Sequence, residues 1–245
     1  MMKLFVFQTP ESVPQGSLPD CAIAVDVLRA TTTIANALLS GAEAVQAFSN
    51  LDTLMLESES WEAHKRIRIG ERGGKKVDGF DLGNSPEACT PERVKGKRIF
   101  MSTTNGTRAL ESIRKAPMVL TAAFTNRARV VQHLLETQPE TIWVVGSGWE
   151  GTFSLEDTTC AGAIASLLME KTGQDLLSLA GNDETIGAVS LYEVYKDRLL
   201  DMAKLASHGQ RMLGLNLLED MKYCVQEDNQ DILPIQSEPG VLVKA

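Results

Sequence analysis

Residues 22–28 read Ala-Ile-Ala-Val-Asp-Val-Leu, and a segment with helical spacing follows at about 31–40. A short apolar run that leads into a helix is the repeating unit of α/β proteins. Further runs of this β type recur along the chain, mostly with helical segments between them, at 4–7, 44–48, 66–70, 98–102, 119–123, 142–146 and 233–236. This alternation predicts an α/β fold, a layered sandwich in which helices flank a mostly parallel or mixed sheet.

The expected helices lie at 31–40, 51–61, 106–115, 126–137, 155–171, 183–206 and 217–226. The last three of them take up most of the last third of the chain. Because the strand pattern is rare after residue 155, we expect a helix-rich C-terminal third that forms a cap or a second lobe. Residues 1–245 are expected to form a single catalytic unit, with a boundary near residue 150 if it consists of two lobes.

The acidic composition restricts the class of partner. The chain has 245 residues and a formal net charge of −8. Nucleic acids and anionic membranes attract basic surfaces, so we expect neither as a partner. The one local excess of basic side chains lies at 65–76, where Glu71 is the only acid, and we interpret it as a solvated face.

The cysteines and the apolar segments bear on metal binding and on location. Four cysteines lie far apart without a CxxC pair, a spacing that offers neither a zinc site nor a compact disulfide framework. The N-terminal apolar stretch is too short for a signal peptide, and no later segment has the length of a membrane span. We expect a cytoplasmic protein that can form a homo-oligomer.

The segment 102–108 reads Ser-Thr-Thr-Asn-Gly-Thr-Arg and lies after a strand and before a helix. Hydroxyls and the N–H groups at a helix start are the donors that a phosphate or sulfonate needs, and an arginine adds a charged fork. A helix start needs only one such residue, so we expect this segment to bind a small anionic phosphate ester. The alternative is a helix cap with a turn at Asn-Gly. The substrate-binding candidates are Thr103, Thr104, Asn105, Gly106, Thr107 and Arg108.

Asp26 ends a buried-looking strand, where an unpaired carboxylate would be costly. Mg²⁺ would compensate it, because this ion prefers one or two carboxylates together with water and substrate oxygens. A structural pair between Asp26 and Arg29, or a capped turn, explains the spacing equally well. We include Arg29 among the candidates for anion recognition.

Three further carboxylates occur within eight residues, next to a glycine-rich segment at 146–151. Together with Asp26 they are enough for a hard metal ion. Against this, Asp157 stands where a capping box opened by Ser154 requires an acid, and Glu156 suits the helix dipole. The catalytic candidates are Asp26, Glu150 and Asp157, and the candidate metal ligands are Asp26, Glu156 and Asp157.

The connection at 71–86 is long, polar and rich in glycine, as functional loops often are. Arg72, Asn84 and Ser85 are candidates for substrate contacts, and a plain surface loop is the alternative. His208 lies beside a glycine turn and could act as a general acid. A histidine that opposes the dipole at a helix C-terminus explains its position as well, and we favour that interpretation.

Two covalent mechanisms lack their signatures. Phosphatases that form an aspartyl-phosphate read Asp-x-Asp after their first strand, but the residue two positions beyond Asp26 is Leu28. Cysteine-based phosphatases read Cys-x5-Arg, and no cysteine of this chain has an arginine six residues on. The sequence therefore indicates neither of these covalent mechanisms.

Five blocks occur in a fixed order, and they read DVLRATTT at 26–33, GERGG at 70–74, FDLGNSP at 80–86, STTNGTR at 102–108 and GSGWEG at 146–151. Together they closely resemble the 2-phosphosulfolactate phosphatase family of the cyanobacterial type. The resemblance implies Mg²⁺-dependent hydrolysis of (R)-2-phospho-3-sulfolactate to 3-sulfolactate and phosphate, a step of coenzyme M biosynthesis in methanogenic archaea. The alternatives are a non-catalytic anion or metabolite sensor, and another phosphoryl-group enzyme such as a kinase or mutase.

Overall fold

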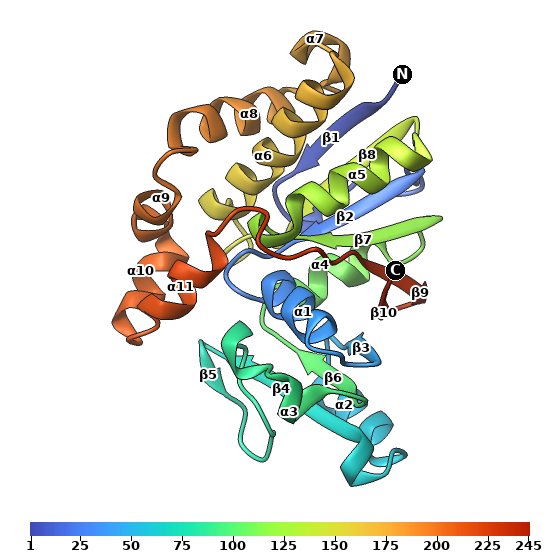
Figure 1. The fold of residues 1–245 in the computed structure, drawn as a ribbon, viewed down its shortest axis with the longest axis vertical. Helices are drawn as coiled ribbons and strands as arrows, with labels where there is room; N and C mark the ends of the chain where they lie inside the picture. The colour runs from blue at the N-terminus through green and yellow to red at the C-terminus, as the bar shows by residue number, and fades with distance from the viewer.

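The computed structural model describes residues 1–245, in which helices pack against one large sheet (Figure 1). The ten-stranded sheet has the order β1-β8-β2-β7-β9-β10-β3-β6-β4-β5. Its strands are β1 (Lys3–Phe7), β2 (Cys21–Val25), β3 (Ala44–Ala47), β4 (Arg66–Arg72), β5 (Lys75–Lys76), β6 (Arg98–Ser102), β7 (Met118–Ala122), β8 (Thr141–Gly146), β9 (Pro234–Glu238) and β10 (Val241–Lys244). The prediction of an α/β fold with a mostly parallel, mixed sheet is confirmed.

The helices are most frequent in the C-terminal third, as predicted. They are α1 (Ala30–Leu39), α2 (Leu51–Glu59), α3 (Pro91–Val94), α4 (Gly106–Ile113), α5 (Arg127–Thr137), α6 (Leu155–Thr172), α7 (Leu176–Leu179), α8 (Asp183–Tyr195), α9 (Leu199–Leu205), α10 (Ser207–Gly214) and α11 (Leu218–Cys224). Figure 1 shows α7 to α11, in orange to red, along one side of the molecule. None of the helices combines the length and the apolar character that crossing a lipid bilayer requires.

Two groups of parallel strands make up the sheet. β1, β8, β2 and β7 form one group, and β3, β6 and β4 form the other. The antiparallel hairpin of β9 and β10 connects the groups, because β9 pairs with β7 and β10 pairs with β3. The loops at the carboxyl ends of parallel strands are the usual place for a ligand in such sheets.

The central strand β2 explains the apolar run at 22–28. All five of its residues are buried, and alternate residues belong to two different clusters of the core. Because alternate side chains of a strand point to opposite faces, helices cover both faces of β2. The strand ends at Val25, earlier than the predicted 28, because the chain turns at Asp26 to enter α1.

The structure departs from the predicted elements mainly in the last third. The predicted helix at 183–206 is two helices, α8 and α9, because Arg198 has a non-helical backbone conformation between them. Neither the α10 helix nor the β10 strand is among the predicted elements. The larger core cluster joins Val144 of β8 to Ile164 and Met202, so buried side chains pack together across position 150.

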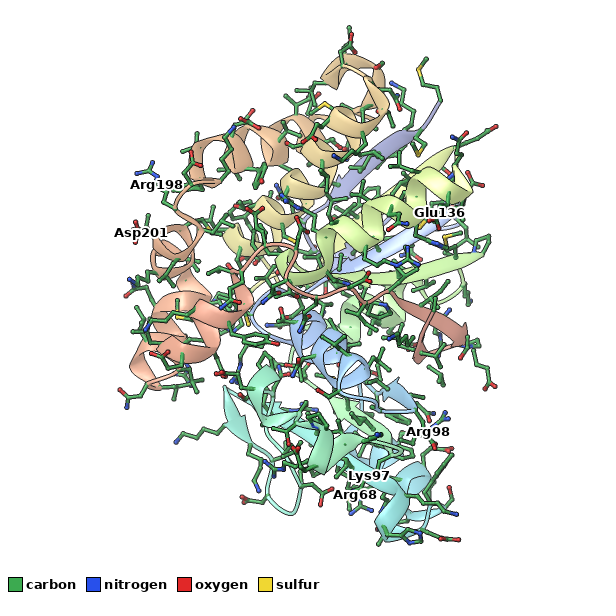
Figure 2. The ribbon with its side chains drawn as sticks, viewed as in Figure 1. Arg68, Lys97, Arg98, Glu136, Arg198 and Asp201 are labelled. Atoms are coloured by element: carbon green, nitrogen blue, oxygen red, sulfur yellow. The ribbon has the colours of Figure 1, made fainter.

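The basic segment 65–76 is only partly a solvated face, because two of its arginines hold the end of α2. Arg66 donates to the backbone carbonyl of Ser58, and Nε of Arg68 donates to Oγ of Ser58 at 2.8 Å. The last carbonyl groups of a helix lack partners within the helix, so Arg66 satisfies one of them while Arg68 holds the side chain of Ser58. Figure 2 shows Arg68 at the end of the molecule opposite α7.

Helices α6 and α8 touch at Gly162. A Cβ at Gly162 would overlap the carbonyl group of Ala188 in α8. The missing side chain therefore lets the two backbones meet, and both helices contribute to the larger core cluster. Gly187, the residue before Ala188, is exposed and has open space where a Cβ would lie.

Gly162→Ala should lower the free energy of unfolding by about 1–3 kcal/mol, because the added methyl group forces the two helices apart. The matched variant Gly187→Ala should raise it by about 0.5–1 kcal/mol, since alanine is the better residue inside an exposed helix. Urea denaturation of both variants measures the two changes. If both substitutions changed the free energy of unfolding equally, the helices would not meet at Gly162.

Candidate functional site

A cavity of about 270 Å³ lies where the loops after β2, β4, β6 and β8 meet helix α10. Its volume suits a small metabolite, and its place at the carboxyl ends of strands is usual for a ligand. The polar side chains that line it belong to Asp26, Arg29, Glu71, Asn84, Thr103, Thr104, Asn105, Glu150, His208 and Arg211. All but Glu71, His208 and Arg211 are among the predicted site residues.

The turn from β2 into α1 fixes the carboxylate of Asp26. Asp26 is only 5% exposed, and its Oδ1 accepts a hydrogen bond from the N–H of Ala30 at 3.0 Å. Oγ1 of Thr31 accepts from the N–H of Asp26 at 3.0 Å and donates to its carbonyl oxygen at 2.9 Å. The hydroxyl of Thr32 donates to the carbonyl of Val27. The threonines therefore satisfy the backbone of the turn and hold Asp26 at the cavity wall.

Helix α4 starts against this turn, at Gly106. A Cβ at this position would lie 2.6 Å from Oδ2 of Asp26 and 2.5 Å from the Cβ of Ala30, so only glycine fits. The carboxylate of Asp26 consequently lies beside the N-terminus of α4, where the helix dipole favours negative charge. The N–H groups of Asn105 and Gly106 have no acceptor in the protein and can donate to an anion.

Glu71, at the end of β4, holds the loop after β6 in place. Its Oε1 accepts from the N–H of Thr104 at 2.8 Å, and its Oε2 accepts from the N–H of Gly74 at 2.7 Å. Both carboxylate oxygens are therefore used within the protein, although Glu71 lines the cavity. Two sequence signals point to this residue, because it is the single acid in a basic segment and lies in the block GERGG at 70–74.

Arg29 is paired with a residue of the distant helix α11. Its guanidinium donates to the carboxylate of Asp220, and Oγ of Ser85 donates to the other carboxylate oxygen at 2.7 Å. Arg29 and Asp220 are both buried. The alternative of a pair between Arg29 and Asp26 is therefore wrong, and the partner lies too far along the chain for a local pattern to indicate it.

Asn84 brings an unpaired amide to the cavity. It is 5% exposed, and its Oδ1 has no hydrogen-bond partner in the protein. A buried amide oxygen without a partner costs free energy, so its position favours a ligand or a water molecule that completes the bond. Of the predicted substrate contacts, Asn84 carries the clearest sign of a missing partner.

Helix α10 places His208 at the cavity wall. The imidazole stacks on Trp149 with ring centroids 4.1 Å apart, and its Nδ1 lies 3.2 Å from Oε1 of the buried Glu156. These two contacts fix the ring and leave Nε2 without a protein partner. His208 lies in the first turn of α10, so the interpretation as a helix C-terminal histidine is wrong. The break before α10, at Ala206, coincides with the end of the predicted helix at 183–206, and α10 itself is not predicted.

Asp157 ties the ends of β2 and β8 together. Its Oδ1 accepts from the N–H of Val27 at 2.9 Å, and its Oδ2 accepts from Oγ of Ser147 at 2.9 Å. Ser154 caps α6 by accepting from the N–H of Asp157, as the sequence pattern indicates. Both carboxylate oxygens thus have protein donors, and Asp157 does not line the cavity.

The acids around the cavity repel one another. Burial raises the pKa of Asp157 well above its ordinary value, and the charges of Glu156 and Asp26 add to this effect. Burial also raises the pKa of Asp26, while His208 and the N–H of Ala30 oppose the change. The site therefore concentrates negative charge that a bound cation would relieve.

Five of the predicted substrate contacts do not line the cavity, namely Arg72, Ser85, Gly106, Thr107 and Arg108. Arg108 pairs with Glu11 on the exterior, and Arg72 donates to Oγ of Ser102 at 2.8 Å. The hydroxyl of Thr107 donates to a backbone carbonyl of its own loop at 3.0 Å. Arg108 faces outward because it follows the start of α4 by two positions, and residues two apart in a helix do not face each other.

Known proteins are similar to this chain along nearly its whole length. The family model of 2-phosphosulpholactate phosphatase matches residues 7–239. The chain is 61% identical over 242 residues to a probable 2-phosphosulfolactate phosphatase of Cyanothece sp. (strain PCC 7425), with 99% of each chain covered. Proteins of the same name from Trichormus variabilis and Synechocystis sp. are 62% and 59% identical, with 98% and 100% of each chain covered. The resemblance of the five sequence blocks is confirmed, and this chain belongs to the 2-phosphosulfolactate phosphatase family.

Proposed function

We propose that this chain is a Mg²⁺-dependent phosphatase that hydrolyses 2-phosphosulfolactate to 3-sulfolactate and phosphate. The names of its relatives support this substrate. The observation that carries the proposal is that Asp26 and Asn105, whose N–H at the start of α4 has no acceptor in the protein, line one small cavity. Such a cavity can hold a phosphate ester and a metal ion together.

The phosphoryl group would bind at the start of α4. The N–H groups of Asn105 and Gly106 are available there, and Thr104 is exposed beside them. The positive end of the helix dipole adds to the attraction of an anion. The amide of Asn84 offers a donor and an acceptor to another part of the substrate. These groups are neutral, so they position the ester without offsetting its charge.

Asp26 and Glu150 are our candidates to hold Mg²⁺. Both line the cavity, and Oδ2 of Asp26 and the carboxylate of Glu150 accept no hydrogen bond from the protein. No group of three or more acidic, histidine or cysteine side chains has an arrangement that could hold a metal ion. The site still fits Mg²⁺, because this ion often takes one or two carboxylates and completes its shell with water and phosphate oxygens. When bound, it would offset the charge of the phosphoryl group and make the attacking water more acidic.

Glu156 and Asp157 are better suited to positioning than to metal binding. Both oxygens of Asp157 accept hydrogen bonds from the protein, and Glu156 faces His208. A metal ligand would have to give up these partners. We therefore assign Asp157 to holding the ends of β2 and β8, and Glu156 to orienting the imidazole of His208.

Direct attack by water is the mechanism that the protein groups favour. Burial raises the pKa of all four cysteine thiols, which keeps them protonated and weakly nucleophilic. No second aspartate follows Asp26 at the spacing of phosphatases that form an aspartyl-phosphate. The carboxylate of Asp26 or Glu150 would instead orient a water molecule in line with the leaving oxygen.

His208 would donate a proton to the leaving oxygen of the ester. Glu156 orients the ring through Nδ1, and Nε2 has no protein partner on a residue that lines the cavity. An alkoxide is a poor leaving group, so a proton delivered as the P–O bond breaks lowers the barrier. Trp149 keeps the plane of the ring by stacking on it.

The purified protein should release phosphate from 2-phosphosulfolactate with Mg²⁺ and lose that activity in EDTA. Asp26→Asn should lower kcat by at least about a hundredfold, since it removes the charge that holds the metal and orients water. Asp201→Asn, at an exposed position of α9 (Figure 2), should match the wild type. Binding of the ester without phosphate release would identify a sensor instead. Wild-type turnover by Asp26→Asn at saturating Mg²⁺ would exclude the metal assignment.

His208→Gln should slow hydrolysis of the alkyl ester by about 10²–10⁴-fold, because the leaving oxygen then lacks a proton donor. An aryl phosphate with an acidic leaving group needs no such proton, so its hydrolysis should fall much less. Turnover of both esters by the variant and the wild type measures the difference. His64→Gln, at an exposed histidine, is the control. An equal loss for both esters would argue against proton donation.

Asp157→Asn should keep the fold and raise the free energy of unfolding at neutral pH. Asparagine can accept from Val27 and donate to Ser147, and it removes a charge buried beside Glu156 and Asp26. Because the pKa of Asp157 is raised in the folded state, its charged form costs stability once the pH exceeds the ordinary value of 3.8. The difference in the free energy of unfolding between the variant and the wild type should therefore vanish below pH 3.8. It should grow as the pH rises from 3.8 through the raised pKa of Asp157. Urea denaturation across this range measures it.

Asp157→Ala is the contrasting variant, because it leaves the N–H of Val27 and the hydroxyl of Ser147 without an acceptor. It should be less stable than the wild type by about 1–3 kcal/mol. A loss of Mg²⁺-dependent activity in Asp157→Asn without a gain in stability would make Asp157 a metal ligand after all.

A further inference from the structure

We infer that Arg211 of α10 binds the sulfonate of the substrate and thereby selects sulfonated phosphate esters. The inference rests on the proposed function, because it assigns one substrate group to one side chain of the same cavity. Arg211 lines the cavity but lies outside all five sequence blocks that resemble the family.

An ester with three anionic groups requires a cation that is not already paired. The substrate carries a phosphate, a carboxylate and a sulfonate, while three acids line the cavity. The two arginines at the wall are Arg29 and Arg211. The charge of Arg29 is already offset by its buried partner Asp220. Arg211 has no acidic partner, and its only acceptor in the protein is the carbonyl oxygen of Gly73, at 3.1 Å.

The single bond to Gly73 fixes one end of the guanidinium of Arg211 and leaves its other donors available. A guanidinium carries five N–H donors in a planar fork. A sulfonate offers three oxygens in the same tetrahedral arrangement as a phosphate, and arginine binds such groups through two parallel hydrogen bonds. Arg211 therefore has both the charge and the free donors that a sulfonate needs.

Packing on two sides holds α10 against the cavity. Met212 belongs to the larger core cluster, and a Cβ at Gly74 would overlap the side chain of Leu215. His208 and Arg211 are three positions apart, so they share one face of the helix. The helix thus presents an imidazole and a guanidinium to the same space, and the position of Arg211 is set by the core on one side and the β4–β5 turn on the other.

The sulfonate is the substrate group that reaches farthest from the ester. The carboxylate is attached directly to the carbon that bears the phosphate, whereas a methylene group separates that carbon from the sulfonate. With the phosphoryl group at the start of α4, the sulfonate has the longer reach across the cavity, and Arg211 is the lining arginine that has no acidic partner. We therefore assign Arg211 to the sulfonate and not to the carboxylate.

Steady-state kinetics of Arg211→Met with three esters tests the inference. The esters are 2-phosphosulfolactate, 2-phospholactate, which lacks the sulfonate, and 2-phosphooxyethanesulfonate, which lacks the carboxylate. For both sulfonated esters kcat/KM should fall about ten- to a hundredfold, mainly through KM, because a charged hydrogen-bonded contact is lost. For 2-phospholactate the loss should be at least about tenfold smaller. Arg211→Lys keeps the charge without the fork and should recover part of the affinity.

Arg198→Met is the matched control, because Arg198 is an exposed arginine of the same helical region outside the cavity (Figure 2). It should match the wild type on all three esters. Equal losses with and without the sulfonate, or no loss on the sulfonated esters, would overturn the assignment. A loss confined to esters with a carboxylate would overturn it as well, since Arg211 would then bind that group.

The wild-type protein separates this inference from the proposed function. If it hydrolyses 2-phosphosulfolactate while Arg211→Met shows no selective loss, only the assignment of Arg211 fails. If it releases phosphate from 2-phospholactate but not from the sulfonated ester, the proposed function fails and the assignment fails with it. Thermal unfolding shows whether each variant is folded, and if Arg211→Met is not, Arg211→Lys against the wild type carries the comparison.

Discussion

The close approach of the β2–α1 turn to the start of α4 determines the rest of the site. Gly106 leaves just enough room for the carboxylate of Asp26 and the first turn of α1. Because β2 and β6 belong to different groups of parallel strands, this contact also joins the two groups through the helices that follow them. Burying a carboxylate is costly, and the N–H of Ala30 and the helix start offset part of that cost. This contact therefore packs α1 against α4 and holds Asp26 in the site.

The distribution of charge around the cavity follows from that contact. Acids from three loops converge on a space where most basic side chains already have partners. Such a space repels an anionic ester unless a cation enters with it. Each of the two ligands would then raise the affinity for the other by the same factor, as linked binding requires. The net charge of −8 acts in the same direction, because it attracts cations and repels the ester.

The sequence predicts the parts of the fold and the site that are local in the chain. Asp26 and Glu150 follow strands closely, so the order of strand, turn and helix is enough to bring them to the cavity. Asp220 and Arg211 arrive through the packing of distant helices, which no local pattern encodes. The sequence also does not show which way a side chain points. Arg108 has the charge and donors to bind an anion, but it faces the exterior and pairs with Glu11. The break between α8 and α9 escapes prediction because helical spacing continues across it in the segment 183–206.

The hairpin of β9 and β10 also affects how a newly made chain acquires its structure. It is synthesised after every other strand, yet it is the only link between the two groups of parallel strands within the sheet. The edges of β3 and β7 emerge from the ribosome long before it and stay unpaired until residues 234–244 arrive. Contacts across so much sequence form slowly. A nascent chain therefore exposes two open sheet edges, and chaperones that shield such edges would find their targets on β3 and β7.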